Sequence, residues 1–328
     1  MKILVTGGAG YIGSHTVRKL RDAGHEIVIF DNLSAGHKDA IKGFDLVVGD
    51  LASKEDLKKV FDENKFEAVV HFVGSIEAGE SMTDPKRFFN NNLVNGLNLL
   101  EAMLEHDVKK IVFSSTAAVY GEPEKMPIEE SDPKNPTNVY GETKLMFEQV
   151  LEAYDHAYGL KSVCLRYFNA AGADPSGEIG ADHKHKTHLI TLALLTALGQ
   201  RDSIKIFGTD YPTKDGTGVR DYVHVNDLAD AHVLALDFLN KNNKSDKFNL
   251  GNEKGTSVRE VLETAKKITG VNFSVIEEPR RAGDPAQLFA SSKKAQQILG
   301  WQPKFASIEQ ILETAWNWHK KHPEGFLE

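Results

Sequence analysis

The chain has 328 residues, of which 41% are hydrophobic and 26% are charged. Such values are ordinary for a globular protein, and this length allows one or two domains. The formal net charge of −8 at pH 7 argues against nucleic acid as a partner. No signal peptide precedes the first apolar stretch, and no apolar run is long enough to cross a bilayer. We therefore expect a cytoplasmic protein with no membrane partner.

The first half of the chain alternates predicted strands with predicted helices. The strands cover residues 2–6, 26–30, 45–48, 68–72, 111–113 and 162–166, and the helices cover residues 14–23, 53–64, 85–91, 96–106 and 140–154. This alternation predicts a doubly wound α/β fold, with a parallel sheet and helices on both of its faces. Ligands of such folds lie at the carboxyl ends of the strands.

A glycine-rich turn joins the first predicted strand to the first predicted helix. Gly7, Gly10 and Gly13 allow a tight turn, a close approach of the backbone to a pyrophosphate, and close packing of the helix. The helix N-terminus then offers free N–H groups to phosphates. Asp31 ends the next strand, where it can accept hydrogen bonds from an adenosine ribose. Its charge would repel a 2′-phosphate, so the pattern predicts NAD rather than NADP.

Tyr140 and Lys144 are four residues apart on a predicted helix, so their side chains lie on the same face. A nearby ammonium favours the phenolate and lowers the pKa of a tyrosine. The pair is therefore a candidate general base at neutral pH. The alternative is a surface helix turn with no chemical role.

Hydroxyl groups gather upstream of this pair, at the end of a predicted strand. Ser114 and Thr116 would lie at the carboxyl edge of the sheet, where Thr116 can hold a substrate hydroxyl while Tyr140 takes its proton. The alternative is a loop rich in serine and threonine. His71 also ends a strand, and it is equally consistent with a ligand contact and with a packed position.

The second half of the chain begins with a polar, loop-like stretch after about residue 172. Helices are then predicted over residues 189–199, 227–239 and 258–269, and short strands over residues 204–208 and 248–251. Arg220 and Arg281 could clamp a diphosphate with bidentate hydrogen bonds, or could each form a surface salt bridge. His183, His185 and His188 have no cysteine or clustered carboxylate beside them, so we expect no metal site.

Seven stretches carry family motifs, namely residues 7–15, 31–33, 79–81, 114–121, 140–146, 165–172 and 210–225. They resemble the extended short-chain dehydrogenase/reductase superfamily, and within it the family of UDP-glucose 4-epimerases, also called UDP-galactose 4-epimerases. The resemblance implies a Rossmann NAD-binding domain of residues 1–170 with a returning segment near residues 222–245. It also implies a UDP-sugar-binding domain of residues 171–328 and a homodimer.

The same resemblance implies an isomerase that interconverts UDP-glucose and UDP-galactose in galactose metabolism. Tyr140, as a phenolate, would remove the proton from the sugar 4-hydroxyl while Thr116 holds that hydroxyl. The C4 hydride would pass to tightly held NAD, and the transient 4-keto sugar would present its other face before the hydride returns from enzyme-bound NADH. Lys144 and the positive nicotinamide would both keep Tyr140 ionised.

The resemblance also assigns residues to each ligand. Those that would contact NAD are Gly7, Gly10, Tyr11, Ile12, Gly13, Asp31, Asn32, Asp50, Leu51, Phe72, Val73, Asn91, Ser114, Tyr140, Lys144 and Phe168. Those that would contact the UDP-sugar are Thr116, Tyr140, Asn169, His188, Leu189, Lys205, Phe207, Arg220, Val258, Arg281 and Asp284.

Four positions depart from the family pattern. Val73 stands where a small residue is usual beside the cofactor, and Ile76 where some relatives have lysine. His188 replaces a usual asparagine, although it can still donate and accept hydrogen bonds. Leu288 is smaller than the tyrosine of some relatives at a position thought to separate plain hexoses from N-acetylated ones. UDP-N-acetylhexosamines are therefore possible further substrates.

Three alternative functions share parts of this pattern with the epimerase. A nucleotide-sugar 4,6-dehydratase needs an acid/base pair directly after Thr116, but Ala117 and Ala118 cannot carry a proton. A UDP-uronate decarboxylase is disfavoured only by the resemblance over residues 210–225. A non-catalytic NAD-binding regulator would need neither Thr116 nor the pair of Tyr140 and Lys144.

Overall fold

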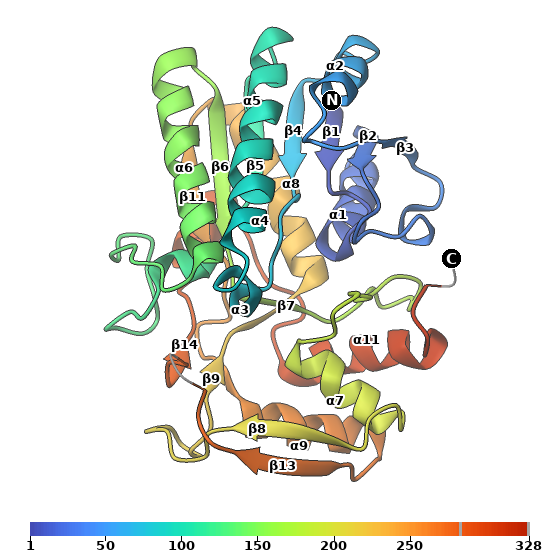
Figure 1. The fold of residues 1–328 in the computed structure, drawn as a ribbon, viewed down its shortest axis with the longest axis vertical. Helices are drawn as coiled ribbons and strands as arrows, with labels where there is room; N and C mark the ends of the chain where they lie inside the picture. Colours follow the sequence, from blue (N-terminus) through green and yellow to red (C-terminus); the bar gives the residue numbers. More distant parts are fainter. Residues whose placement is uncertain (282–283, 327–328) are drawn as a thin grey trace.

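The computed structural model describes residues 1–281 and 284–326, and a sheet of seven parallel strands forms its centre (Figure 1). The strand order across the sheet is β11-β6-β5-β4-β1-β2-β3. These strands are β1 (Lys2–Thr6), β2 (Glu26–Asp31), β3 (Asp45–Val48), β4 (Ala68–His71), β5 (Lys110–Ser114), β6 (Lys161–Arg166) and β11 (Asp246–Asn249). The central strands are continuous apolar runs because both faces of the sheet are covered.

Helices cover the two faces of this sheet and create a separate hydrophobic core on each side. In Figure 1, α5 and α6 lie in front of the sheet and α8 lies behind it. The helices of the rear face are α1 (Tyr11–Asp22) and α8 (Val225–Asn242), and those of the front face are α2 (Lys54–Asp62), α5 (Asn95–Glu105) and α6 (Val139–Tyr158). The fold is therefore doubly wound, as predicted.

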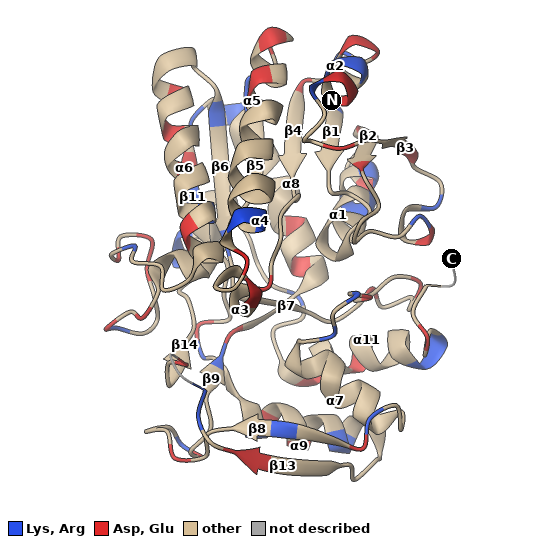
Figure 2. Cartoon of the chain, in the orientation of Figure 1, with Lys and Arg blue, Asp and Glu red and all other residues tan. Residues whose placement is uncertain are grey.

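A smaller α/β part lies beyond the carboxyl ends of the strands, in the lower half of Figure 1. Its β8 and β13 pair in parallel, and its three helices share a third core with them. Figure 2 shows the basic segment of β8 beside the acidic segment of β13. The elements are α7 (Leu189–Ala197), β8 (Ser203–Phe207), α9 (Val258–Thr269), β13 (Ser274–Glu278) and α11 (Ile308–Lys321).

Short elements connect the two parts and surround the space between them. β7 pairs with β10, and β9 lies between β12 and β14. The short strands are β7 (Asn169–Ala171), β9 (Val219–Arg220), β10 (Tyr222–His224), β12 (Thr256–Ser257) and β14 (Gln287–Leu288). The short helices are η1 (Asp39–Ile41), α3 (Ala78–Ser81), α4 (Pro85–Phe89), the π-helix η2 (Asn90–Val94), η3 (Ala117–Tyr120) and α10 (Lys293–Leu299).

Most of the predicted elements are confirmed, and β1, β3 and α9 have the predicted ends. The helix predicted from residue 14 begins at Tyr11, directly after Gly10. The two helices predicted near residues 85–106 are joined by the π-helix η2. The prediction misses β7, β9, β10, β12, β13 and β14. Within the described residues, no helix is both long and apolar enough to span a membrane.

Candidate functional site

The glycine turn leaves the N-terminus of α1 open to a ligand. Gly10 is the N-cap residue, and no side chain caps the helix, so its first N–H groups remain available. Gly7 has a φ of +75°, and a Cβ there would lie 2.9 Å from the backbone nitrogen of Val73. A Cβ at Gly13 would collide with the carbonyl oxygen of Gly7. Only glycine fits either position, and the thin turn that results suits a diphosphate.

Asp31 lies at the carboxyl end of β2, beside the same turn. Its Oδ2 accepts a hydrogen bond from the Ala9 backbone at 2.9 Å, and its Oδ1 accepts one from the Leu33 backbone at 2.8 Å. Burial raises the pKa of Asp31, although both hydrogen bonds lower it. Each carboxylate oxygen keeps a second lone pair for a ribose hydroxyl. Nearby, Asn32 Nδ2 donates to Asp50 Oδ2 at 2.8 Å, which brings together two further residues predicted to contact NAD.

The glycine turn follows β1, whose neighbours in the sheet are β2 on one side and β4 on the other. The strand order reverses between β1 and β4, and such a switch point opens a crevice for ligands. Phe72 and Val73 follow β4 and lie directly against Gly7. The turn, the acidic residue at the end of β2 and this crevice together fit a bound dinucleotide.

The predicted base lies on the first turns of α6, at the carboxyl end of β5. The helix begins at Val139 because Asn138 Oδ1 accepts a hydrogen bond from the Gly141 backbone at 2.9 Å. Thr116 Oγ1 accepts from the Ala118 backbone at 3.1 Å, so its own hydroxyl proton is free to bond Tyr140. Lys144 Nζ donates to the Ser114 carbonyl oxygen at 2.9 Å. The structure therefore brings four predicted residues together at the carboxyl ends of the strands, here called the edge of the sheet: Ser114, Thr116, Tyr140 and Lys144.

The pKa of Tyr140 runs against the direction expected from the sequence. Burial raises it, and the carboxylate of Glu77 raises it further, while the hydrogen bond from Thr116 lowers it. Burial also lowers the pKa of Lys144 to about 8, whereas Glu148 raises it. The spacing of Tyr140 and Lys144 indicates the effect of the ammonium, but the cost of burying a phenolate depends on the folded structure. The ammonium is instead held by the Ser114 carbonyl, above the Phe113 ring at 4.7 Å.

His71 is a packed residue at the end of β4, which decides between its two interpretations. Its Nδ1 lies 2.7 Å from Thr6 Oγ1, and its ring stacks on Phe113 with centroids 5.7 Å apart. The side chain is buried, and burial together with the charge of Lys144 lowers its pKa to about 3. His71 is therefore a neutral residue of the core beneath the site.

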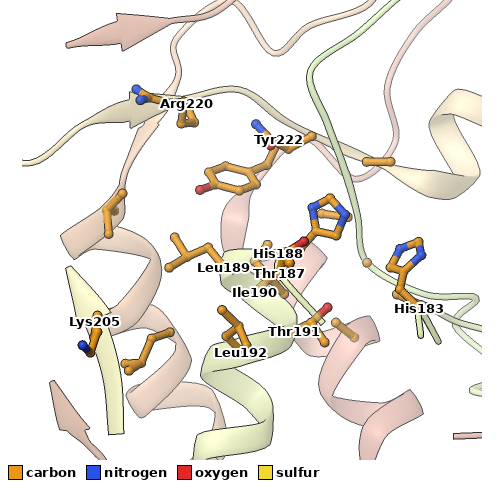
Figure 3. Close-up of a pocket in the computed structure, with 18 of the residues that line it drawn as sticks. His183, Thr187, His188, Leu189, Ile190, Thr191, Leu192, Lys205, Arg220 and Tyr222 are labelled. Atoms are coloured by element: carbon orange, nitrogen blue, oxygen red, sulfur yellow. The ribbon is translucent and has the colours of Figure 1, made fainter. Parts of the chain in front are cut away.

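A cavity of about 380 Å³ opens between the sheet and the smaller part. In Figure 3, His183 and His188 lie on one side of it and Lys205 on the other. Its lining contains every residue predicted for the UDP-sugar except Thr116 and Tyr140, that is, Asn169, His188, Leu189, Lys205, Phe207, Arg220, Val258, Arg281 and Asp284. Lining residues that the prediction missed include Thr187, Tyr211 and Tyr222.

Three cationic residues of the cavity are held by anionic or aromatic neighbours. Arg220 Nη2 lies 3.4 Å from Asp284 Oδ1, and the Arg281 guanidinium lies 3.8 Å from the centroid of the Phe207 ring. Lys205 Nζ pairs with Glu278 Oε1 at 2.8 Å. Arg220 and Arg281 therefore line the same cavity, as a clamp on a diphosphate requires. Arg220 also forms a salt bridge, which was the alternative interpretation.

Two histidines of the cavity are uncharged at neutral pH. The rings of His183 and His188 have centroids 5.1 Å apart, and the Tyr11 ring lies 5.5 Å from that of His183. Burial lowers the pKa of His183 to about 4 and also lowers that of His188. Across the described part of the chain, no three His, Cys, Asp or Glu residues gather where they could hold a metal ion. The histidines can therefore offer neutral hydrogen bonds to a ligand.

Asn92 is a further buried residue of the site that sequence reasoning missed. It lies on the π-helix η2, where its Oδ1 accepts from the Ser75 backbone at 2.7 Å and its Nδ2 donates to Thr143 Oγ1 at 3.1 Å. A Cβ on Gly74 would lie 3.2 Å from Lys144 Nζ and 3.3 Å from Asn92 Oδ1. The signal was the run of three asparagines over residues 90–92, at the end of a predicted helix, of which only Asn91 was named.

A model of the NAD dependent epimerase/dehydratase family matches residues 3–251. The chain belongs to this family. A UDP-glucose 4-epimerase of Halalkalibacterium halodurans is 54% identical over 326 residues, which cover 99% of this chain and 98% of that protein. The dependence of the family on NAD agrees with the glycine turn and the crevice beside it.

Solved structures of similar proteins share the whole fold. A UDP-glucose 4-epimerase of Bifidobacterium longum, in complex with NAD+ and UDP, is 38% identical with a TM-score of 0.94, and the match covers 99% of this chain and 100% of that one. The UDP-Glc/GlcNAc 4-epimerase of Campylobacter jejuni is 46% identical with a TM-score of 0.86, covering 98% of this chain and 99% of the other.

Proposed function

We propose that this protein interconverts UDP-glucose and UDP-galactose by inverting the sugar at C4. The observation that carries the proposal is the placement of Thr116, directly before η3, and of Tyr140, on the first turn of α6, at the carboxyl ends of the strands that also form the NAD crevice. A proton acceptor and a second hydroxyl are thus placed together where a sugar hydroxyl can reach both. The adjoining cavity, with Arg220 and Arg281 in its lining, suits the diphosphate of a nucleotide sugar.

Each residue has one task in this mechanism. Thr116 holds the sugar 4-hydroxyl, and Tyr140 takes its proton as a 4-keto sugar forms. NAD, when bound, supplies the acceptor that takes the hydride from C4 and gives it back. Lys144 places a cation at the edge where Tyr140 must be ionised. Tyr140 then returns its proton to the new hydroxyl, so one residue removes and restores a single proton.

The residues after Thr116 argue against a 4,6-dehydratase. Elimination of water across C5 and C6 needs an acid and a base beside the sugar. Ala117 is buried and cannot exchange a proton, and Ala118 donates only its backbone N–H to Thr116. Epimerisation needs no further group.

The substrate range of this proposal includes UDP-N-acetylhexosamines. Leu288 pairs with Arg220 between β14 and β9, and it packs on the small cluster that contains Ala117. It therefore lies between the predicted phosphate clamp and the residue next to Thr116. A leucine at this point is smaller than the tyrosine of some relatives, which supports including N-acetylated sugars in the proposal.

The proposal also includes a homodimer. Two exposed apolar side chains lie on this side of the sheet, Val94 of the π-helix η2 at 46% and Tyr158 at the end of α6 at 53%. Burying such residues favours association of two copies. Light scattering after gel filtration should give twice the mass of the chain, and Val94→Glu should shift the protein toward a monomer. A monomer from the unmodified chain would contradict this part of the proposal.

One assay tests the reaction and its range. The purified protein is mixed first with UDP-galactose and then with UDP-N-acetylgalactosamine, without added NAD, and the C4 epimers are separated and measured. We expect UDP-glucose in the first case and UDP-N-acetylglucosamine in the second. Release of carbon dioxide from a UDP-uronic acid would favour the decarboxylase instead. Protein that carries no NAD and interconverts no nucleotide sugar would favour a non-catalytic regulator.

A further inference from the structure

The helix α6 carries a third polar residue on the face that bears the predicted base. Glu148 follows Lys144 by four residues, as Lys144 follows Tyr140, so the three side chains form one stripe. The end of β5 meets this stripe residue by residue. Thr116 lowers the pKa of Tyr140, the Ser114 carbonyl accepts from Lys144, and Ser115 Oγ donates to Glu148 Oε1 at 2.5 Å.

Glu148 is fixed in turn by Arg166 at the end of β6. Both side chains are buried, with exposures of 0% and 1%. Arg166 Nε donates to Glu148 Oε1 at 2.9 Å, and Arg166 Nη2 donates to Glu148 Oε2 at 2.5 Å. The pair is therefore a bidentate fork, which restricts distance and angle together.

The fork continues into neighbouring elements. Arg166 Nη1 donates to the Tyr120 hydroxyl at 2.7 Å, and that hydroxyl donates to Asn249 Oδ1 at 2.8 Å. Tyr120 ends η3, which begins directly after Thr116, and Asn249 ends β11. One buried network thus joins α6 to the ends of three structural elements that surround the base.

A buried ion pair contributes little net stability, because the charges lose their hydration. An apolar pair of similar size would hold α6 against the sheet equally well. It would not fix the rotation of the helix or its position along its axis, which the fork and the hydrogen bond from Ser115 both determine. Small displacements of a reacting group are costly in rate.

We propose that Glu148 and Arg166 are positioning residues, whose buried pair sets the register of α6 against residues 114–116 and so places Tyr140 and Lys144 for proton transfer. This inference rests on the proposed function, since it names further residues of the same site. Neither residue touches the substrate cavity, and neither was identified from the sequence.

Glu148 has a second effect, on the charge of Lys144. Burial lowers the pKa of Lys144, and Glu148 raises it. The other titratable groups near this ammonium are Tyr140 on the same helix and His71 from β4, and His71 is neutral. Arg166 is fully engaged by Glu148 and Tyr120. Glu148 is thus the carboxylate that helps Lys144 to remain charged.

The decisive variant is Glu148→Met combined with Arg166→Met, which removes both buried charges and should still fold. We expect an unchanged content of NAD, kcat for UDP-galactose lowered at least about tenfold, and KM within about twofold of the original. Glu148→Asp keeps the charge but shortens the side chain, so its kcat should be intermediate. The matched control is Asp155→Asn, which breaks the ion pair of Asp155 with Lys161 at the far end of α6 and should leave kcat unchanged.

A second measurement needs no substrate and therefore separates this inference from the proposed function. Lys144 is acetylated over a range of pH, and the modified peptide is quantified by mass spectrometry. Glu148→Gln and the double variant should lower the midpoint by about one pH unit, whereas Asp155→Asn and Glu148→Asp should not. Folded variants with the original kcat and an unmoved midpoint would overturn the proposal, as would an equal loss of kcat in Asp155→Asn. Absence of epimerisation by the unmodified protein would refute the proposed function, while the acetylation midpoints would still test the pair.

Discussion

The edge of the sheet around Tyr140 and the cavity around Arg220 are built in different ways. At the edge, Thr116 and Lys144 are 5% and 3% exposed, and each is bonded to a fixed neighbour. In the cavity, Arg220 and Lys205 are 18% and 53% exposed and pair with carboxylates. The first region is held rigidly, as a proton transfer requires, whereas the cations of the second can exchange their carboxylate partners for the phosphate groups of a ligand.

This difference suits the two tasks of the proposed reaction. Proton transfer tolerates little misplacement, so its groups are held by buried contacts. A sugar that must present both faces to the same cofactor has to rotate in its binding site. The residues proposed to bind its diphosphate therefore lie away from the base, on other segments of the chain. Substitutions at the edge should therefore change kcat, and substitutions in the cavity should change KM.

The largest effect is expected at the edge, from Tyr140→Phe. This change removes the group that takes the proton, so turnover of UDP-galactose should fall about a thousandfold. The content of NAD, measured after denaturation, should remain, because the glycine turn is unaltered. The matched control is Tyr158→Phe on the exposed end of the same helix. Turnover at the original rate in Tyr140→Phe would show that another group is the base.

Lys144→Met should have the next largest effect and should change the pH dependence. Without the cation the pKa of Tyr140 rises further, so kcat at pH 7 should fall about a hundredfold and recover partly as the pH is raised. In the unmodified protein the ammonium has a pKa of about 8, so it is charged below that pH and loses its charge above it. Its support for Tyr140 should therefore weaken as the pH rises through about 8. An unchanged pH profile in the variant would show that Lys144 is not the main influence on Tyr140.

In the cavity, Arg220→Ala should raise KM for UDP-galactose about tenfold to a hundredfold with little change in kcat. A hydrogen bond to a charged group contributes about 1.5–3 kcal/mol, which corresponds to this range. Inhibition by UDP should weaken in parallel. Arg259→Ala is the control, because Arg259 pairs with Glu277 on an exposed surface of the same part. A fall in kcat at constant KM would show that Arg220 acts in the chemical step rather than in substrate binding.

The smallest effect is expected from Leu288→Tyr, which should leave turnover of UDP-galactose within about twofold. Turnover of UDP-N-acetylgalactosamine should fall about tenfold or more, because the larger side chain occupies the space for the acetamido group. The ratio of the two kcat/KM values measures the effect. An unmodified protein that turns over only UDP-galactose would contradict the proposed substrate range directly.

Local patterns allowed much of the fold to be predicted. Ser53, Asn138 and Ser257 each cap the helix that follows them, and caps depend on residues that are close in sequence. The short strands β7 and β10 were missed because they exist only through pairing with each other, across about fifty residues of chain. Strand β13 was missed because most of its residues are exposed and show no apolar run.

The candidate site was predictable in the same measure. The spacing of Tyr140 and Lys144 is local, and it indicates the candidate base directly. The partners of these residues were not visible, since Ser114 and Glu148 meet Lys144 only after the sheet and α6 have packed together. The burial of Tyr140 is not visible in the sequence either. For this reason the expected direction of its pKa shift was wrong. The residues of the cavity were named through the resemblance, and no local pattern would have gathered them.

The edge strand β11 has a consequence for synthesis on the ribosome. It pairs with β6, yet it follows β7, α7 and β8 in the chain and ends only at Asn249. The nascent chain must therefore carry β6 with an unpaired edge, and the sheet without α8 on its rear face, while α7 and β8 of the smaller part are being made. Unpaired edges and uncovered apolar surface invite aggregation. A fragment that stops after β6 should therefore need a chaperone to remain in solution.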